Sequence, residues 1–471
     1  MRRDRGRQAL LVLFLLMLPL VTSRLRGADE IEYFSYLRSA VFDRDLHFEN
    51  EYRHFVDAEP QALQGFKETF LDRREPLTGR PINFAPAGTA SLWAPFYLLA
   101  HAGVLAAREL GSAVAADGYS RPYLMAISYA SALYGFLGLL LAHDALRRFG
   151  RVRDPAAALA VAAVWLGTPA LYYLTIAPGF SHACSMFTLA LVFWLSLRTL
   201  EGGASRARDW VALGAAVGLA GLVREQDALV GIVPAAVLLV ELLMYRSLPS
   251  VVGKAILLGG TALAVFVPQA LAYHAVNGTY GPSKLVVRKM SWSSPHLVEA
   301  LVSPGHGLFV WAPLLALGAL GLLLSLRDPR QRTTSLLLLV AFGVQAWICG
   351  AVESWSQAGA FGSRRFVGLT FVFAWGLGLL LAPTRPAVAT PATAASATSW
   401  PRSAVLQAAG LSLFVLWNLG LMVQFGLKLM DRQRLEWPRV AVNQVTEVPR
   451  RLGRTAFLFF TDREALVLES R

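Results

Sequence analysis

Two adjacent carboxylates, Asp29 and Glu30, open a polar segment that follows the first apolar run of the chain. Acids at such a position can cap a helix, because the N-terminus of a helix favours negative charge. They can also act as a general base that deprotonates or orients an acceptor hydroxyl or amine. The residue types alone leave both interpretations of Asp29 and Glu30 open.

Two histidines stand beside Gly-Pro breaks in apolar sequence. His182 follows the break at 178–181, and an ionisable group at membrane depth is a functional candidate unless hydrogen-bonded packing explains it. His306 lies in the tight break at 303–308, where we expect its side chain and the backbone amides to face a bound anion.

Four further cations are candidates for a phosphate site. Lys284 and Arg288 lie in the polar segment 277–305, and a lysine suits a phosphate as a point charge, although contact with lipid headgroups would also explain it. Arg364 and Arg365 begin an apolar run, where guanidinium groups can bind phosphate through two hydrogen bonds or simply extend to the membrane interface.

One more polar interruption breaks an apolar stretch, at Arg224, Glu225 and Asp227. It predicts either a hairpin turn that dips toward a wet cavity or a local ion pair. A carboxylate base beside cations that hold a phosphate leaving group is the arrangement that transfer of a sugar from a lipid phosphate requires. The chain has no nucleotide-binding fingerprint that would indicate a sugar nucleotide instead.

The amino-acid composition indicates that such a site would belong to a membrane protein. The 471 residues are 55% hydrophobic and 16% charged, with a mean hydropathy of +0.47, which is typical of an integral membrane protein. The net charge of +13 comes from short basic clusters between apolar runs, so the positive-inside rule explains it and nucleic-acid binding is excluded. Cys184 and Cys349 both fall in predicted spans, which supports neither a disulfide framework nor a metal site, and no cofactor or divalent cation is indicated.

We therefore predict an all-α polytopic membrane protein with about eleven transmembrane helices. The ambiguous run is 89–110: if it crossed the membrane, three arginine clusters would move to the outer face, so we expect an interfacial or re-entrant helix. The predicted spans are 8–22, 122–142, 155–176, 181–198, 210–223, 227–245, 255–276, 306–326, 333–352, 365–382 and 403–426.

The topology that follows places every polar feature of interest on one side. We expect a bacterial inner-membrane protein with a cytoplasmic N-terminus, a transmembrane domain over 1–426, a flexible cytoplasmic linker at 383–402 and a short outer tail at 427–471. The first outer loop, 24–121, should contain interfacial helices. Apolar residues recur at helical spacing from Asp29 to Asp43, which predicts an amphipathic helix along the membrane surface.

Several short motifs resemble those of the GT-C superfamily of polytopic glycosyltransferases, specifically the bacterial relatives of protein O-mannosyltransferases and aminoarabinose lipid A transferases (glycosyltransferase family 39-like). The resemblance covers most of the spans. The motifs are 29–33 after the first span, 43–46 at the end of the loop helix, the interfacial helix that begins near Pro86, 303–308, and 361–366.

This resemblance implies a polyprenyl-phosphate sugar donor, inversion at the sugar carbon, and Asp29 as the catalytic acid-base residue. Our own expectation is that Glu30 and His182 support Asp29. The acceptor would be a lipid, a glycan or a protein. The chain departs from the aminoarabinose group at three positions, Glu32, Ala85 and His182, where those relatives have a basic residue, a lysine and an aspartate. The missing lysine moves the expected donor-phosphate contact to the cations named above and His306, namely Lys284, Arg288, Arg364, Arg365 and His306.

Two other classes of function remain to be distinguished. A polytopic transporter or lipid flippase of the cell envelope would need polar residues at the bilayer midplane on several helices, whereas here the polar groups gather toward one surface. A scaffold without an active site would tolerate replacement of the same acids and arginines.

Overall fold

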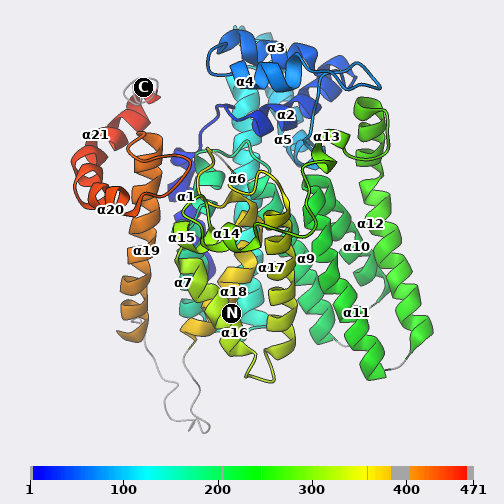
Figure 1. Ribbon diagram of the computed structural model, residues 1–471, viewed down its shortest axis with the longest axis vertical. Coiled ribbons are helices and arrows are strands. Elements are labelled where there is room, and N and C mark those ends of the chain that lie inside the picture. Colours follow the sequence, from blue (N-terminus) through cyan, green and yellow to red (C-terminus); the bar gives the residue numbers. More distant parts are fainter. Residues whose placement is uncertain (1–3, 203–205, 246, 358, 383–401, 464–471) are drawn as a thin grey trace.

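The structure is a computed structural model that describes residues 4–202, 206–245, 247–357, 359–382 and 402–463. Within these ranges the chain forms helices and two isolated β-bridges but no strand. Figure 1 shows a bundle of long helices with the helices of the segment 28–71 gathered at one end, which we call the loop end. The all-α class predicted from the sequence is confirmed.

Apolar runs form the long helices, and three of these begin with a proline in the first turn, where its missing N–H costs nothing. Eight helices of the described residues are long and apolar enough to cross a membrane. The helices of the bundle are α1 (Arg5–Met17), α6 (Arg121–Arg148), α7 (Asp154–Leu166), α9 (His182–Gly202), α10 (Ala207–Val223), α11 (Ile232–Tyr245), α12 (Leu248–Asn277), α16 (Leu314–Ser325), α17 (Arg332–Ala351), α18 (Thr370–Leu381) and α19 (Arg402–Gly426).

Two of the predicted spans are not continuous helices. The span 155–176 breaks near Pro169 into α7 and α8 (Ala170–Thr175), and the span 306–326 breaks near Pro313 into α15 (Leu308–Trp311) and α16. A proline cannot donate the hydrogen bond that would continue the preceding helix, which explains both breaks. The number of eleven spans stays a prediction, and most of the linker predicted at 383–402 lies outside the described residues.

The loop end is built from helices that follow α1 and its last turn, η1 (Leu18–Leu20). They are α2 (Ala28–Arg38), η2 (Ser39–Asp43), α3 (Glu49–Ala58), α4 (Gln64–Phe66) and η3 (Lys67–Leu71), and the long helix α5 (Gly88–Glu109) follows them. The expectation that 29–43 is helical is confirmed, but the expectation of a one-sided surface helix is wrong. Eight consecutive residues of α2, from Glu30 to Leu37, are buried, because α3 and α5 pack against this helix within the protein.

Helix α5 corresponds to the run 89–110, for which the sequence leaves open whether it crosses the membrane. It packs along the first half of α6, where the indole N–H of Trp93 donates to Ser131 Oγ at 2.8 Å and the rings of Tyr97 and Tyr123 lie 5.0 Å apart. Its first residue, Gly88, lies against the backbone of Leu222 at the end of α10, where a Cβ would not fit. The helix is long and apolar enough to cross a membrane. Whether 89–110 crosses stays a prediction.

At the opposite end of the bundle, a carboxylate ties the first helix to the core. Asp154 accepts hydrogen bonds from the backbone N–H of Gly6 at 2.8 Å and from His143 at 3.0 Å, and it pairs with Arg147 at 2.7 Å. Asp4, His143 and Asp154 also have the spacing of a metal site. Arg147 pairs with both acids, at 3.8 Å from Asp4 and 2.7 Å from Asp154, so we interpret the group as a structural clamp.

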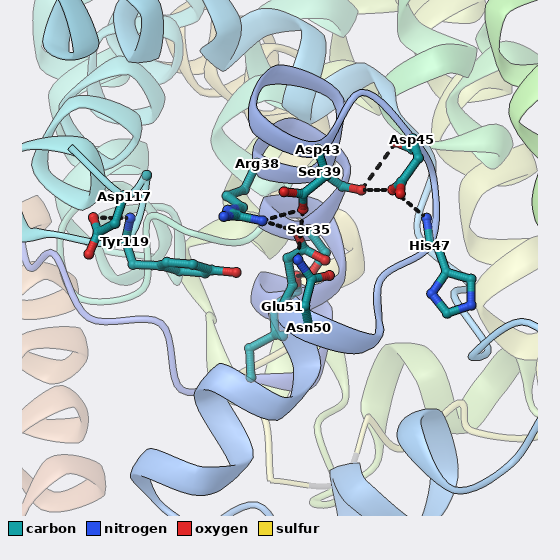
Figure 2. Close-up of polar contacts among 12 residues, drawn as sticks. Ser35, Arg38, Ser39, Asp43, Asp45, His47, Asn50, Glu51, Asp117 and Tyr119 are labelled. Carbon is teal, nitrogen blue, oxygen red and sulfur yellow. Dashed lines mark hydrogen bonds and ion pairs between the residues drawn. The ribbon is translucent and has the colours of Figure 1, made fainter. Parts of the chain in front are cut away.

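A second polar cluster ties the loop helices to one another (Figure 2). Arg38 of α2 pairs with Asp43 of η2 and with Glu51 of α3, the latter at 3.0 Å. Asn50 donates to Asp43 at 2.7 Å, so the same carboxylate connects all three helices. Removal of one partner would leave a buried charge without compensation, because Glu51 is fully buried.

This cluster predicts a pH-dependent stability. Burial raises the pKa of Glu51 to about 7, against the lowering effect of Arg38. The folded protein therefore holds this proton between pH 4.5 and about 7 while the unfolded chain releases it, so that stability falls as the pH rises through this range. We expect Glu51→Gln to flatten the dependence of the melting temperature of the detergent-solubilised protein on pH between about 5 and 8.

The matched control is Glu49→Gln in the same helix. The pKa of Glu49 is lowered by its hydrogen bonds to Arg53 and Arg74, so this carboxyl is ionised in both states across that range and its removal should leave the slope unchanged. An unchanged slope in Glu51→Gln would contradict the assignment.

Candidate active site

The first turn of α2 separates the roles of the two adjacent acids. The Glu30 carboxylate accepts hydrogen bonds from the backbone N–H groups of Gly27 at 2.7 Å and Arg26 at 2.8 Å, so Glu30 is the residue that caps the helix. Asp29 makes no such bond. Its side chain is 40% exposed and pairs with Arg364 at 3.0 Å. Asp29 is therefore the acid that solutes can reach.

Burial dominates the protonation of the capping acid. The side chain of Glu30 is 3% exposed, and desolvation raises its pKa to about 7 even though two backbone N–H groups stabilise the charged form. Glu32, two residues further along α2, is also buried, and desolvation raises its pKa well above the ordinary value. Neither buried acid is free to exchange partners as Asp29 is.

The turn that precedes α9 packs directly on this first turn. A Cβ at Gly27 would lie 2.6 Å from Cζ of Phe180, and one at Gly179 would lie 2.8 Å from the Glu30 carboxylate. The two glycines therefore allow the two turns to touch. This contact brings His182 and the acidic pair, which are far apart in the sequence, to the same end of the bundle.

We expect Gly27→Ala to destabilise the protein by about 1–3 kcal/mol, the usual cost of an extra methyl group in a packed site. The backbone at Gly27 is compatible with alanine, since φ is −84°, so the cost is steric. Gly103→Ala in α5 is the control, because nothing lies within 4 Å of its Cβ and an alanine there should be neutral or stabilising. Thermal unfolding in detergent measures both, and equal melting temperatures would contradict the packing argument.

Arg364 is held in place by its partners on two sides. Its guanidinium lies over the ring of Phe180, 5.0 Å from the centroid, as well as against Asp29. The preceding loop is fixed because the Tyr173 hydroxyl bonds to both the N–H and the carbonyl of Phe361 at 3.2 Å. The start of η5 (Arg364–Leu369) is thereby positioned beside the first turn of α2.

His182 is buried and binds a second arginine. Arg224, at the end of α10, donates to His182 Nδ1 at 2.9 Å and to Ser181 Oγ at 3.3 Å. An arginine can only donate, so Nδ1 must be the unprotonated ring nitrogen, and the neutral ring carries its hydrogen on Nε2. This Nε2 has no hydrogen-bonding partner among the described residues. His182 is thus a donor rather than a base.

Two arginines at this end of the bundle lack carboxylate partners. Among the described residues, neither Arg224 nor Arg365 forms an ion pair, and Arg365 instead donates to the carbonyl oxygen and the hydroxyl of Ser354 at 3.1 and 2.9 Å. Arg224, Arg364 and Arg365 all act electrostatically on His182. Three guanidinium groups therefore share this region with the one exposed carboxylate of Asp29, which leaves an excess of positive charge suited to an anion.

The local ion pair considered for the polar interruption after α10 does not form. Glu225 in η4 (Glu225–Gly231) accepts from the Tyr273 hydroxyl, and Asp227 accepts from Ser185 Oγ at 2.5 Å. Arg224 turns to His182 instead. Arg224 is therefore a site residue that the sequence pattern does not identify, although the polar interruption marks its position. The feature that could have identified it is a basic residue at the end of an apolar helix, α10, that is short for a membrane span.

The other three candidates for phosphate binding, Lys284, Arg288 and His306, form no hydrogen bond or ion pair with Asp29 or Arg364 within the described residues. Lys284 and Arg288, in and after α13 (Lys284–Val287), are exposed, and no contact joins them to Asp29 or Arg364. His306 lies beyond α14 (Leu297–Val302) and is buried; its ring stacks on Trp311 and its Nε2 bonds to the carbonyl of Ala360 at 2.8 Å. The structure thus brings together Asp29, Glu30, His182, Arg364 and Arg365, and the phosphate roles of Lys284, Arg288 and His306 stay predictions.

These features define a multi-pass, all-helical membrane protein with a polar site where loop helices meet the bundle. Comparison with solved structures gives two ArnT structures from Cupriavidus metallidurans. The one bound to undecaprenyl phosphate aligns with a TM-score of 0.50 at 18% identity, over 99% of this chain and 76% of that chain. The one in the apo state aligns with a TM-score of 0.45 at 18% identity, over 98% and 77%.

The chain therefore has the fold of ArnT, and the GT-C-like architecture predicted from the sequence is confirmed. No protein-family model matches the chain, and no curated protein matches its sequence.

Proposed function

We propose that this protein is a membrane glycosyltransferase that moves a sugar from a polyprenyl-phosphate donor to a lipid, glycan or protein acceptor. The observation that carries the proposal is the exposed Asp29 carboxylate at 3.0 Å from Arg364, beside two arginines held by neutral partners. This pairing supplies a base and an anion site within one small region. The ArnT of similar fold binds undecaprenyl phosphate, which supports the same class of carrier here.

The proposed reaction is a single displacement. Asp29 accepts the proton of the acceptor hydroxyl or amine as the acceptor atom bonds to the anomeric carbon. The bond from that carbon to the phosphate oxygen breaks, the electron pair leaves with the polyprenyl phosphate, and the configuration inverts. Arg364, Arg365 and Arg224 stabilise the charge that develops on the leaving phosphate, and the Nε2–H of His182 is available to donate a hydrogen bond.

The proposal also requires that the site lies on one particular side of the membrane, and the arginine clusters of the sequence support that orientation. The loop end would face away from the cytoplasm, with the N-terminus inside and the chain in a bacterial inner membrane. Polyprenyl-linked sugars would then reach Asp29 from the outer leaflet.

The test compares envelope lipids and glycans by mass spectrometry in cells with the gene, without it, and complemented with the gene carrying Asp29→Asn. We expect one sugar modification to disappear without the gene and to stay absent with the variant, while the polyprenyl-phosphate-linked sugar accumulates. Loss of the same modification together with a donor that stays in the cytoplasmic leaflet would instead identify a flippase and overturn the proposal.

A further inference from the structure

The last two helices of the described chain, α20 (Trp437–Val445) and α21 (Glu447–Thr461), are amphipathic. Along α21, Leu452, Ala456 and Phe460 follow one another at four-residue spacing and are exposed, so they form an apolar stripe. Arg450 and Arg454 follow the same spacing on another side of the helix. A water-soluble surface would not retain such a stripe, since Leu452 is 51% and Phe460 60% exposed.

Helix α20 joins this apolar surface to the membrane bundle. Its Trp437 stacks on Trp417 of α19 with centroids 5.1 Å apart, and Gln444 bonds to Gln424 at 2.9 Å. Helix α19 is long and apolar enough to cross a membrane, and it exposes leucines beside this contact, such as Leu416 at 59%. The exposed valines of α20 continue the surface that α19 offers to lipid; they are Val442 and Val445.

The far end of the pair is tied to the start of the chain. Arg463, just after α21, donates to the carbonyl of Pro19 at 2.9 Å and to that of Val21 at 3.4 Å, where α1 ends. Figure 1 shows α20 and α21 beside the part of α19 nearest the loop end. The pair is therefore held against the bundle at both ends while its apolar stripe stays uncovered by the described protein.

The net charge of this segment is positive. Residues 427–463 carry eight lysines and arginines against four aspartates and glutamates. Within α21 the single acid, Glu447, already pairs with Arg450 and Arg451, at 3.5 and 3.1 Å. Basic residues beside an apolar stripe are the pattern of helices that lie in the headgroup region of a membrane and prefer anionic lipid.

We propose that α20 and α21 form an interfacial anchor that inserts its apolar stripe into one leaflet and binds anionic phospholipid headgroups through Arg450, Arg451 and Arg454. This anchor would lie within the segment 427–471, for which the sequence predicts a short outer tail. It is independent of the reaction at Asp29, and it would hold the end of α19 at a fixed height beside the loop end.

The test uses the full-length protein in phosphatidylcholine nanodiscs with increasing fractions of phosphatidylglycerol. A fluorophore is attached at Ala456→Cys, on the stripe, or at Thr461→Cys, on the polar side, and lipids that carry a nitroxide serve as quenchers. Cys184 and Cys349 are fully buried and do not compete for the label. We expect quenching at position 456 but not at 461, and quenching that increases with phosphatidylglycerol.

Charge variants complete the design. Replacing Arg450, Arg451 and Arg454 with glutamine should raise the half-saturating fraction of phosphatidylglycerol by at least about fivefold, the effect of one arginine near an anionic surface. Replacing the same three with lysine keeps the charge and should leave that fraction unchanged. Position 456 unquenched at every composition, or quenched equally without phosphatidylglycerol, overturns the proposal. Self-quenching only when two chains share one nanodisc would identify a contact between copies, and would overturn it too.

Discussion

Asp29→Asn is expected to lower kcat for sugar transfer by about 10²–10⁴-fold, the usual contribution of a positioned general base. Asparagine has the same shape but cannot accept the acceptor's proton. KM for the donor should not rise, because the substitution removes the only carboxylate that pairs with Arg364 among the described residues and so leaves that cation free for phosphate. Initial rates of transfer with a polyprenyl-phosphate sugar donor, measured on purified protein, provide both constants.

The matched control is Asp72→Asn, which makes the same chemical change at an acid of the loop end that is 52% exposed. Its rates should equal those of the unmodified protein. Melting temperatures of both variants should stay close to that of the parent, because Asp29 is not the residue that caps α2. Full activity in Asp29→Asn would remove the proposed base, and a large loss of melting temperature would show that the carboxylate is structural.

Arg364→Gln is expected to lower kcat/KM for the donor by about 10²–10³-fold, as the loss of one preorganised donor to a developing oxyanion does. The substitution removes the guanidinium that contacts Asp29 and lies over Phe180, so the leaving phosphate loses a fixed cation. Arg364→Lys keeps the charge but not the planar, two-pronged donor, and it should recover only part of the activity. Steady-state kinetics at several donor concentrations separate the effects on kcat and KM.

Arg288→Gln serves as the comparison, since Arg288 is an exposed cation of the segment 277–305. We expect a smaller loss than for Arg364→Gln. A larger loss would place the donor phosphate near α13 instead of η5, and would restore the role that the sequence suggested for Lys284 and Arg288.

The class of fold could be predicted from the apolar runs alone. Long apolar runs that cannot expose their backbone to lipid must form helices, so the all-α bundle could be predicted without any contact being known. The acidic pair at Asp29 and Glu30 could also be placed at the start of a helix, because a polar segment with apolar residues at helical spacing follows it. The two prolines that split α7 from α8 and α15 from α16 were visible, but their effect depends on whether neighbouring helices satisfy the freed backbone groups.

The separate roles of the site residues depend on contacts between distant segments. Asp29 and Glu30 have the same chemistry in sequence, and only the backbone N–H groups of Arg26 and Gly27 assign the cap to Glu30. Arg224 became a site residue because the turn before α9 brings His182 within 2.9 Å of it. Local periodicity reports which residues share a face of one helix, whereas hydrogen bonds and ion pairs between distant segments depend on packing that no short stretch of sequence encodes.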